Sequence, residues 1–273
     1  MTRCLLIVLL AASSTASAVV IRHDVDDSKY RIPESAFSAL VDMPGEGHGV
    51  LIDPRWVVTA AHTIPRHWEK KQVVINGIAR DVEHVVVHSG YKKPSQDVLD
   101  NALASWDWML FWAQLTASDD IALLKLAQTA TDVSPSAIYD DKNEFDQTVR
   151  IIGKGVTATG ATGYEFSSSR RTELRQAYNK ITSAHDRYFC YVFNEPSEAL
   201  PLEGGAGGGD SGGPVLINTE MGWRLAGLTS WSAGLRSTRT RTGQYGSIIC
   251  NVRLSHYKEW IEGVISEQPR AGG

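Results

Sequence analysis

A serine in a glycine-rich run is the first candidate for chemistry in this sequence. The run Gly209–Pro214 reads Gly-Asp-Ser-Gly-Gly-Pro, which places Ser211 in backbone that can turn sharply. The small neighbours leave room for a substrate carbonyl, and the peptide N–H groups of Gly209 and Ser211 can both point at it. Attack by a serine hydroxyl also needs a base that removes its proton and a carboxylate that orients this base.

His62 and Asp120 are the candidates for these two partners. His62 ends the run Thr59-Ala60-Ala61-His62, which follows a predicted apolar strand, and Asp120 stands at the start of another, Ile121 to Leu124. Each residue alone has an ordinary structural explanation, such as a cap or a turn. Their occurrence together in the order His, Asp, Ser is typical of one class of serine hydrolase and predicts a catalytic triad.

These motifs, at residues 59–62, 120–124 and 209–214, resemble the signature blocks of the trypsin and chymotrypsin family of serine proteases, and the resemblance extends from about Val19 to Ile261. It implies an exported serine endopeptidase that acts on proteins or peptides through an acyl-enzyme. His62 would be the general base, Asp120 would orient it, Ser211 would be the nucleophile, and the N–H groups of Gly209 and Ser211 would form the oxyanion hole. The implied fold is all-β: two packed antiparallel six-stranded β-barrels with the triad in the cleft between them.

Short apolar runs separated by turn residues agree with this fold class. Strands are predicted at residues 49–52, 56–59, 72–75 and 82–87, and again at 148–152, 188–193, 214–217 and 224–229. Residues 255–266 predict a closing amphipathic helix. We assign residues 19–135 to an N-terminal barrel that carries His62 and Asp120, and residues 136–273 to a C-terminal barrel that carries Ser211 and the C-terminal helix.

Residues 95–115 predict a helix inserted before Asp120. Apolar side chains recur there at helical spacing from Val98 to Leu110, and Ser95 is a candidate N-cap. The insertion makes the separation of His62 and Asp120, 57 residues, longer than trypsin-like chains usually have. Two interpretations stay open: a lid over substrate subsites and a purely structural flap.

Residues 1–18 predict a signal peptide. Arg3 precedes an apolar run that is too short to span a bilayer, and Ala16-Ser17-Ala18 offers small residues for cleavage before Val19. An uncleaved membrane anchor is the alternative. No later stretch is long and apolar, so we expect a secreted or periplasmic protein without stable membrane association. The formal net charge of −4 argues against a nucleic-acid partner.

The resemblance also assigns residues to substrate binding. Gly205 matches the base of the family's primary specificity pocket, and Ser230, Trp231 and Ser232 look like the strand that lines it. An uncharged base predicts apolar or small side chains before the cleaved bond, with little cleavage after Lys or Arg. Three arginines at 236, 239 and 241 leave open a preference for acidic side chains.

Activation is a further implication of the resemblance. The family pairs the residue that matches Asp210 with a new N-terminal ammonium, and Val19 would supply one after removal of the signal peptide. A propeptide is the alternative, although the usual activation site, Arg or Lys followed by Ile-Val-Gly-Gly, is missing. The stretch Ile151–Gly155 is similar to the family's Gly-Trp-Gly region, with Lys154 in place of Trp.

Cysteines and histidines add weaker expectations. Cys190 and Cys250 remain after signal removal and form either one disulfide or two buried thiols. The disulfide that brackets the catalytic histidine in the family is replaced by Gly47 and Thr63. We expect no metal and no cofactor, because no zinc motif connects the remaining histidines, which are interpreted as structural or surface residues: His23, His48, His67, His84, His88, His185 and His256.

Two other functions compete with a trypsin-like protease. An α/β-hydrolase lipase also uses Gly-x-Ser-x-Gly, but it needs an acid and then a histidine after the serine, and only His256 follows Ser211. A non-catalytic binding module on a protease-like fold is the other alternative. The complete set of His62, Asp120, Ser211 and the oxyanion glycine argues against it.

Overall fold

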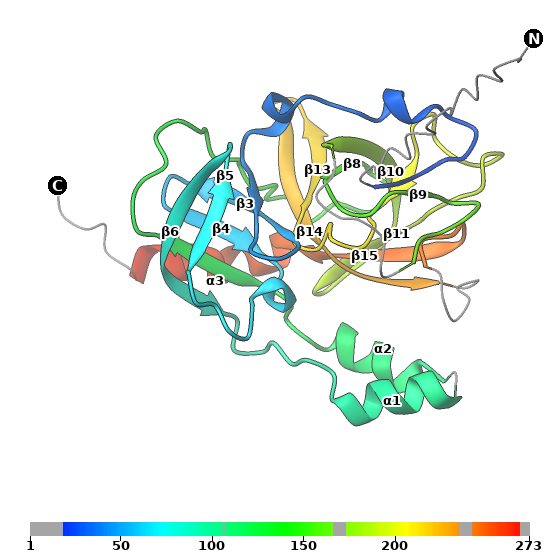
Figure 1. The fold of residues 1–273 in the computed structure, drawn as a ribbon, viewed down its shortest axis with the longest axis horizontal. Helices are drawn as coiled ribbons and strands as arrows, with labels where there is room; N and C mark the ends of the chain where they lie inside the picture. The colour runs from blue at the N-terminus through cyan, green and yellow to red at the C-terminus, as the bar shows by residue number, and fades with distance from the viewer. Residues whose placement is uncertain (1–18, 106, 166–172, 235–241, 268–273) are drawn as a thin grey trace, which may run out of the picture.

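A computed structural model describes residues 19–105, 107–165, 173–234 and 242–267, and shows two closed barrels side by side (Figure 1). The first barrel has the strand order β2-β3-β4-β7-β6-β5, and the second has the order β10-β11-β15-β14-β13-β8. All strand pairs within both barrels are antiparallel. The predicted fold class of two six-stranded antiparallel barrels is therefore confirmed.

The strands differ in length between the two barrels. Those of the first are β2 (Leu40–Asp42), β3 (His48–Asp53), β4 (Trp56–Thr59), β5 (Gln72–Ile75), β6 (Ile78–Val87) and β7 (Ala122–Leu126). Those of the second are β8 (Thr148–Gly153), β10 (Arg175–His185), β11 (Tyr188–Val192), β13 (Pro214–Thr219), β14 (Gly222–Gly234) and β15 (Ser247–Arg253). The predicted boundary at 135–136 lies between β7 and β8 and stays a prediction.

Burial explains why the short apolar runs became strands. All four residues of β4 are buried, and so are all five of β7, which pairs with it. A continuous apolar run of this length is typical of a strand that is buried on both faces. Closure of each sheet also gives the edge strands backbone partners.

A small third sheet joins the start of the described chain to the second barrel. In it, β1 (Val20–Ile21) pairs antiparallel with β12 (Gly204–Gly205) and parallel with β9 (Ala158–Thr159). Val19 and Val20 are buried, with 0% and 1% of their surface exposed. The beginning of β1 is thus held inside the protein close to the Ser211 loop.

The inserted helix is two helices, α1 (Gln96–Ser105) and α2 (Met109–Thr116), which form a hairpin that projects from the barrels (Figure 1). The prediction of one helix over 95–115 was wrong in this detail. Polar side chains at the break bond to the backbone: Ser105 Oγ accepts from the N–H of Asp107, and Asp107 Oδ1 accepts from the N–H of Met109. Such local bonds compete with a continuous helix.

The C-terminal helix is confirmed as α3 (Leu254–Glu267). Leu254, Tyr257 and Ile261 are buried at helical spacing and pack into the apolar core that includes the first barrel. Three short 3₁₀ helices complete the described elements: η1 (Asp27–Lys29), η2 (Glu34–Phe37) and η3 (Ala61–Thr63). In the described ranges, no helix has the length and apolar character needed to cross a membrane.

Candidate active site

His62 and Asp120 are brought together by the first barrel. His62 lies in η3 directly after β4, and Asp120 lies just before β7, the strand that pairs with β4. His62 Nδ1 is 2.7 Å from Asp120 Oδ2, and the His62 peptide N–H donates to Asp120 Oδ1 at 2.9 Å. With the proton on Nδ1, the other ring nitrogen is left as an acceptor.

The environment of His62 favours its charged form. Burial lowers the pKa of His62, but the Asp120 carboxylate, through its charge and its hydrogen bond, raises the pKa above its ordinary value. Asp120 is itself buried and accepts a third hydrogen bond, from Ser230 Oγ at 2.6 Å. Ser230 belongs to β14, so both barrels hold this carboxylate.

The loop that carries Ser211 lies against the segment around His62. The His48 N–H donates to the Ser211 carbonyl at 2.6 Å, and the Gly212 N–H donates to the Thr229 carbonyl at 2.7 Å. A Cβ placed on Gly47 would come within 3.0 Å of Thr63 Cγ2 and 3.1 Å of the Ser211 carbonyl oxygen. Gly47 and Thr63, the positions of the missing disulfide, therefore face each other beside the Ser211 loop.

The Ser211 hydroxyl is held by fewer contacts than the side chains of His62 and Asp120. In the part of the chain that is described, the hydrogen bonds of His62 go to Asp120 and none joins its ring to Ser211. Catalytic hydrogen bonds of this kind are often long before substrate binds. The geometry thus joins His62 to Asp120 directly and places Ser211 on the adjacent loop.

The N–H groups around Ser211 divide into bonded and unbonded ones. Those of Gly207, Asp210, Gly212 and Gly213 donate within the protein. For the N–H groups of Gly209 and Ser211, by contrast, no acceptor is found among the described residues. Gly209 has φ 91°, which a side chain would disfavour.

The Asp210 carboxylate is fully buried beneath this loop. It accepts from the Gly155 N–H at 2.7 Å and the Gly207 N–H at 2.8 Å, and the Val19 N–H also donates to it. Burial raises the pKa of Asp210, while nearby His48 and the three N–H groups oppose this rise. A Cβ on Gly153 would lie 2.1 Å from Asp210 Oδ1. The glycines of the Ile151–Gly155 stretch therefore make space for this carboxylate.

The residues assigned to substrate binding lie in two places. Gly205, in β12, is buried and pairs with Val20, and a Cβ on it would lie 3.0 Å from Ile249 Cδ1. Ser230 is bonded to Asp120, whereas Trp231 and Ser232 are partly exposed further along β14. The three arginines at 236, 239 and 241 lie outside the described residues, as do residues 1–18.

A disulfide joins Cys190 of β11 to Cys250 of β15, which are directly opposite each other in the register of the two strands. Over the described residues, no group of His, Cys, Asp and Glu has a geometry that could hold a metal ion. His48 and His88, interpreted as structural, are indeed partners of acids: His48 Nδ1 is 3.2 Å from Asp42, and His88 Nδ1 is 3.4 Å from Asp119.

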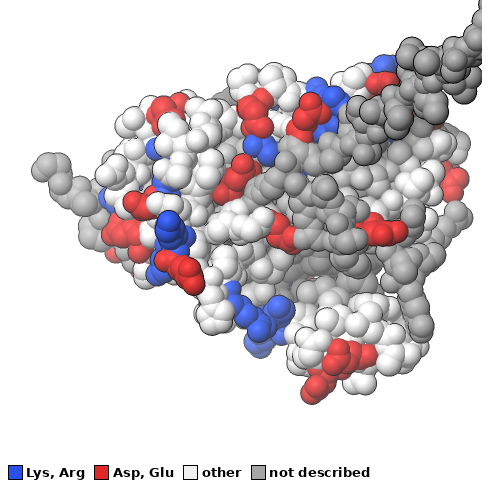
Figure 2. Space-filling view, viewed as in Figure 1, with Lys and Arg blue, Asp and Glu red and all other residues white. Residues whose placement is uncertain are grey.

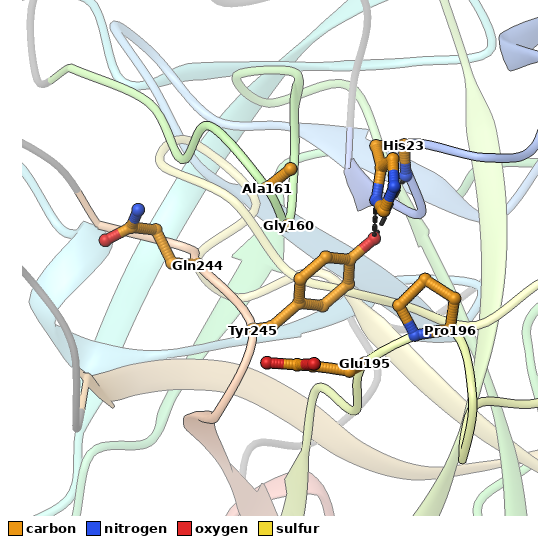
Figure 3. A pocket seen from close by; sticks show the side chains of 7 residues that line it. All are labelled: His23, Gly160, Ala161, Glu195, Pro196, Gln244 and Tyr245. Carbon is orange, nitrogen blue, oxygen red and sulfur yellow. Dashed lines mark hydrogen bonds between the residues drawn. The ribbon is translucent and has the colours of Figure 1, made fainter.

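A cavity of about 290 Å³ lies at the N-terminal strand and not at the triad (Figure 3). His23, Glu195 and Tyr245 line it, together with Gly160, Ala161, Pro196 and Gln244. The Tyr245 hydroxyl is 2.8 Å from His23 Nδ1 and accepts from the His23 N–H at 3.0 Å. The contact fastens the segment after β1 to the second barrel.

Two features of the site were not predicted from the sequence. Asp119 is buried next to Asp120, and its Oδ1 accepts from Arg187 Nε at 2.6 Å and from the Tyr257 hydroxyl at 2.8 Å. In the sequence, the position of Asp119 directly before Asp120 was the only signal for this feature. The second feature is Trp112 of α2, whose ring stacks on Trp231 with 5.5 Å between centroids.

Comparisons with known proteins identify a matching family and several relatives of this chain. The family model described as Trypsin matches residues 25–261. Vitamin K-dependent protein C of Mus musculus is 26% identical over 253 residues, covering 81% of this chain and 46% of the relative. The protein of the same name from Oryctolagus cuniculus is 26% identical over 249 residues, covering 81% and 47%. The chain therefore spans about half the length of these curated relatives.

One solved structure extends the comparison to the fold. Neuropsin, described as a serine protease expressed in the limbic system of mouse brain, superposes with a TM-score of 0.62. The match covers 86% of this chain and 98% of that chain at 19% sequence identity. At this identity the similarity establishes a shared fold.

Proposed function

The chain belongs to the trypsin family, and from this premise we propose that it is a serine endopeptidase that hydrolyses peptide bonds through an acyl-enzyme intermediate. His62 is the general base, Asp120 orients it, and Ser211 is the nucleophile. Gly209 and Ser211 provide the oxyanion hole. Proteins or peptides are the substrates.

The proposed reaction begins at the Ser211 hydroxyl. His62 takes its proton on Nε2 while Ser211 Oγ attacks the substrate carbonyl carbon, and the Asp120 carboxylate stabilises the imidazolium that forms. The N–H groups of Gly209 and Ser211 donate to the oxyanion. His62 then gives its proton to the leaving amine. In the second half of the reaction His62 takes a proton from a water molecule that attacks the acyl carbon, and it returns this proton to Ser211 Oγ as the bond from Ser211 to the acyl group breaks.

The observation that carries this proposal is the contact of His62 Nδ1 with Asp120 Oδ2 at 2.7 Å, beside a loop with two unused N–H groups. The test is the turnover of a peptide substrate by Ser211→Ala, His62→Ala and Asp120→Asn. Each variant should lose several orders of magnitude in kcat and keep its fold, since triad residues act as a unit. Turnover by purified Ser211→Ala at a rate comparable to that of the wild type would contradict the proposal.

We further propose an uncharged primary pocket. Gly205 offers no counter-ion, and the nearest side-chain atom to its position is the apolar Ile249 Cδ1. A lysine or arginine side chain in such a pocket would lose its hydration without gaining a partner. Apolar or small side chains before the scissile bond are therefore the proposed substrates.

Activation by export is the last part of the proposal. Removal of residues 1–18 would turn the Val19 nitrogen into an ammonium at a position where its N–H already donates to Asp210. The ammonium would neutralise a buried carboxylate whose charge is otherwise costly. The Cys190–Cys250 disulfide supports an oxidising compartment, secreted or periplasmic.

A further inference from the structure

Hydrogen bonds occupy the place of the missing disulfide beside His62. Gly47 and Thr63 stand at its two positions, and Thr63 directly follows the candidate base. Thr59 Oγ1 lies 2.9 Å from Thr63 Oγ1 and donates to the carbonyl of His48, the residue after Gly47, at 2.6 Å. The two chain segments that the disulfide would join are therefore linked by hydrogen bonds through Thr59 and His48.

His48 also contacts the loop of the candidate nucleophile. Its N–H donates to the Ser211 carbonyl at 2.6 Å. A Cβ on Gly212 would lie 2.2 Å from the His48 carbonyl oxygen and 2.5 Å from Thr59 Oγ1. A Cβ on Gly213 would lie 3.6 Å from His48 Cδ2, which is ordinary van der Waals contact. The loop thus packs directly on the His48 ring and on the hydrogen bond between His48 and Thr59.

The imidazole of His48 is buried and is oriented at both of its nitrogens. Nδ1 is 3.2 Å from Asp42 Oδ1, which lies opposite His48 in the register of β2 and β3, and Nε2 accepts from the Lys154 N–H at 3.2 Å. A carboxylate at Nδ1 keeps the proton on this nitrogen and leaves Nε2 as the acceptor. The next residue, Gly155, donates its N–H to Asp210 at 2.7 Å. The ring therefore also holds the backbone that binds this buried carboxylate.

The Lys154 ammonium balances the acids around the ring. Its Nζ is 3.3 Å from Asp42 Oδ2 and 2.8 Å from Glu34 Oε2. The cavity that these three residues help to line measures about 20 Å³, which is room for one water molecule and too little for a ligand. On the face drawn in Figure 2, the described acidic and basic side chains lie in small groups and form no broad area of one charge. These observations favour an internal connection over a binding site for a charged ligand.

We propose that His48 is a positioning residue for the reaction: its backbone and its ring, oriented by Asp42, hold the Ser211 loop against the His62 segment in the place of the disulfide. This inference rests on the proposed endopeptidase function. The N–H groups of Gly209 and Ser211 belong to this loop, so a displacement of the loop moves the oxyanion hole away from the charge that develops. A misplacement of about 1 Å in such a site costs about a hundredfold in rate.

The test compares His48→Ala with His48→Gln. In folded His48→Ala, kcat on a peptide substrate should fall by about tenfold to a hundredfold with KM within about twofold, because the oxyanion forms only in the transition state. Glutamine can accept from the Lys154 N–H and donate to Asp42, so His48→Gln should stay within about fivefold of wild type. His84→Ala is the matched control, because His84 is exposed on β6, and it should stay within about twofold.

A peptide boronic acid gives a second measurement, because it forms a tetrahedral adduct with the serine and resembles the transition state. Its Ki should rise in His48→Ala by about the factor by which kcat falls, while the Ki of the matching peptide without boron stays within about twofold. A merely structural role would lower the melting temperature and leave both Ki values unchanged. Thr59→Val keeps the shape of the side chain but removes the hydrogen bond to the His48 carbonyl, and it should lower kcat by about threefold to tenfold.

Several outcomes would overturn the role of His48 and leave the endopeptidase function standing. These are wild-type kcat in folded His48→Ala, a loss of the same size in His48→Gln or His84→Ala, and a loss that weakens both inhibitors alike. Where His48→Ala does not fold, wild-type kcat in Thr59→Val overturns the proposal. Absence of cleavage by the wild type together with an unreactive Ser211 overturns both proposals.

Discussion

The Asp210→Asn substitution tests how the buried carboxylate shapes the loop of Ser211. Asparagine has the shape of aspartate but replaces one oxygen by an NH₂ group. Either Gly155 N–H or Gly207 N–H, now 2.7 and 2.8 Å from the two carboxylate oxygens, would then face a donor. The negative charge that we propose to pair with the Val19 ammonium would also be lost.

The expected effect follows from these contacts. A hydrogen bond to a charged group contributes about 1.5–3 kcal/mol, and breaking a buried ion pair costs about 3–5 kcal/mol. A loss of about 3–5 kcal/mol from the active conformation of the Ser211 loop would lower kcat/KM by roughly a hundredfold to a few thousandfold.

The assay is kcat/KM on a peptide substrate, with thermal unfolding to show that the protein is folded. The matched control is Asp146→Asn, because Asp146 has 67% of its side chain exposed, and this variant should stay within about twofold of wild type. A folded Asp210→Asn enzyme with nearly wild-type kcat/KM would refute the reasoning.

Three further predictions concern pH, specificity and the N-terminus. Asp120 raises the pKa of His62 and the neutral ring is the base, so kcat/KM should fall as the pH drops through a value above about 6.5. In Asp120→Asn this fall should occur at lower pH. A fall at an unchanged pH would contradict the assignment of Asp120 as the partner of His62. A peptide library should show little cleavage after Lys or Arg, and dominant cleavage there would mean that Gly205 is not the pocket base. One extra residue before Val19 should lower kcat, whereas equal activity would mean that Asp210 is satisfied without the terminus.

Local motifs allowed much of the fold to be predicted. The bounds of β4 and β5 match the predicted strands, because each is a short run of mainly apolar residues with a turn signal on one side, Pro54 before β4 and Asn76-Gly77 after β5. The positions of His62 and Asp120 relative to β4 and β7 followed from the same patterns. Here the local sequence and the tertiary structure favour the same conformation.

Buried polar residues kept strand β10 from being predicted from the sequence. Strand β10 contains Arg175 and Asn179, both fully buried, which is unusual for a strand interior. Arg175 is buried because it pairs with Asp27, and Asn179 because its amide donates to the Gly204 carbonyl at 3.0 Å. These partners are far away in the sequence, so no local pattern indicates them. The strand was therefore not predicted.

The stacking of Trp112 on Trp231 and the hydrogen bonds of Asp119 could not be predicted from the sequence for the same reason. Trp112 and Trp231 are more than a hundred residues apart, and only the packing of the hairpin on the second barrel brings the rings together. Arg187 and Tyr257 reach Asp119 from a turn and a helix of the C-terminal half. Spacing along the chain predicted the triad motifs but could not predict what packs around them.

Covalent labelling of Ser211 by a fluorophosphonate tests the central claim most directly. The reagent reacts with a serine whose hydroxyl is activated by a neighbouring base, at a site where N–H groups stabilise the negative charge that develops on the reagent's oxygen. We expect stoichiometric labelling at Ser211 by peptide mass spectrometry, none in Ser211→Ala, and strongly slowed labelling in His62→Ala. A wild-type protein that is folded, begins at Val19 and is not labelled would contradict the account, as would labelling that survives in Ser211→Ala.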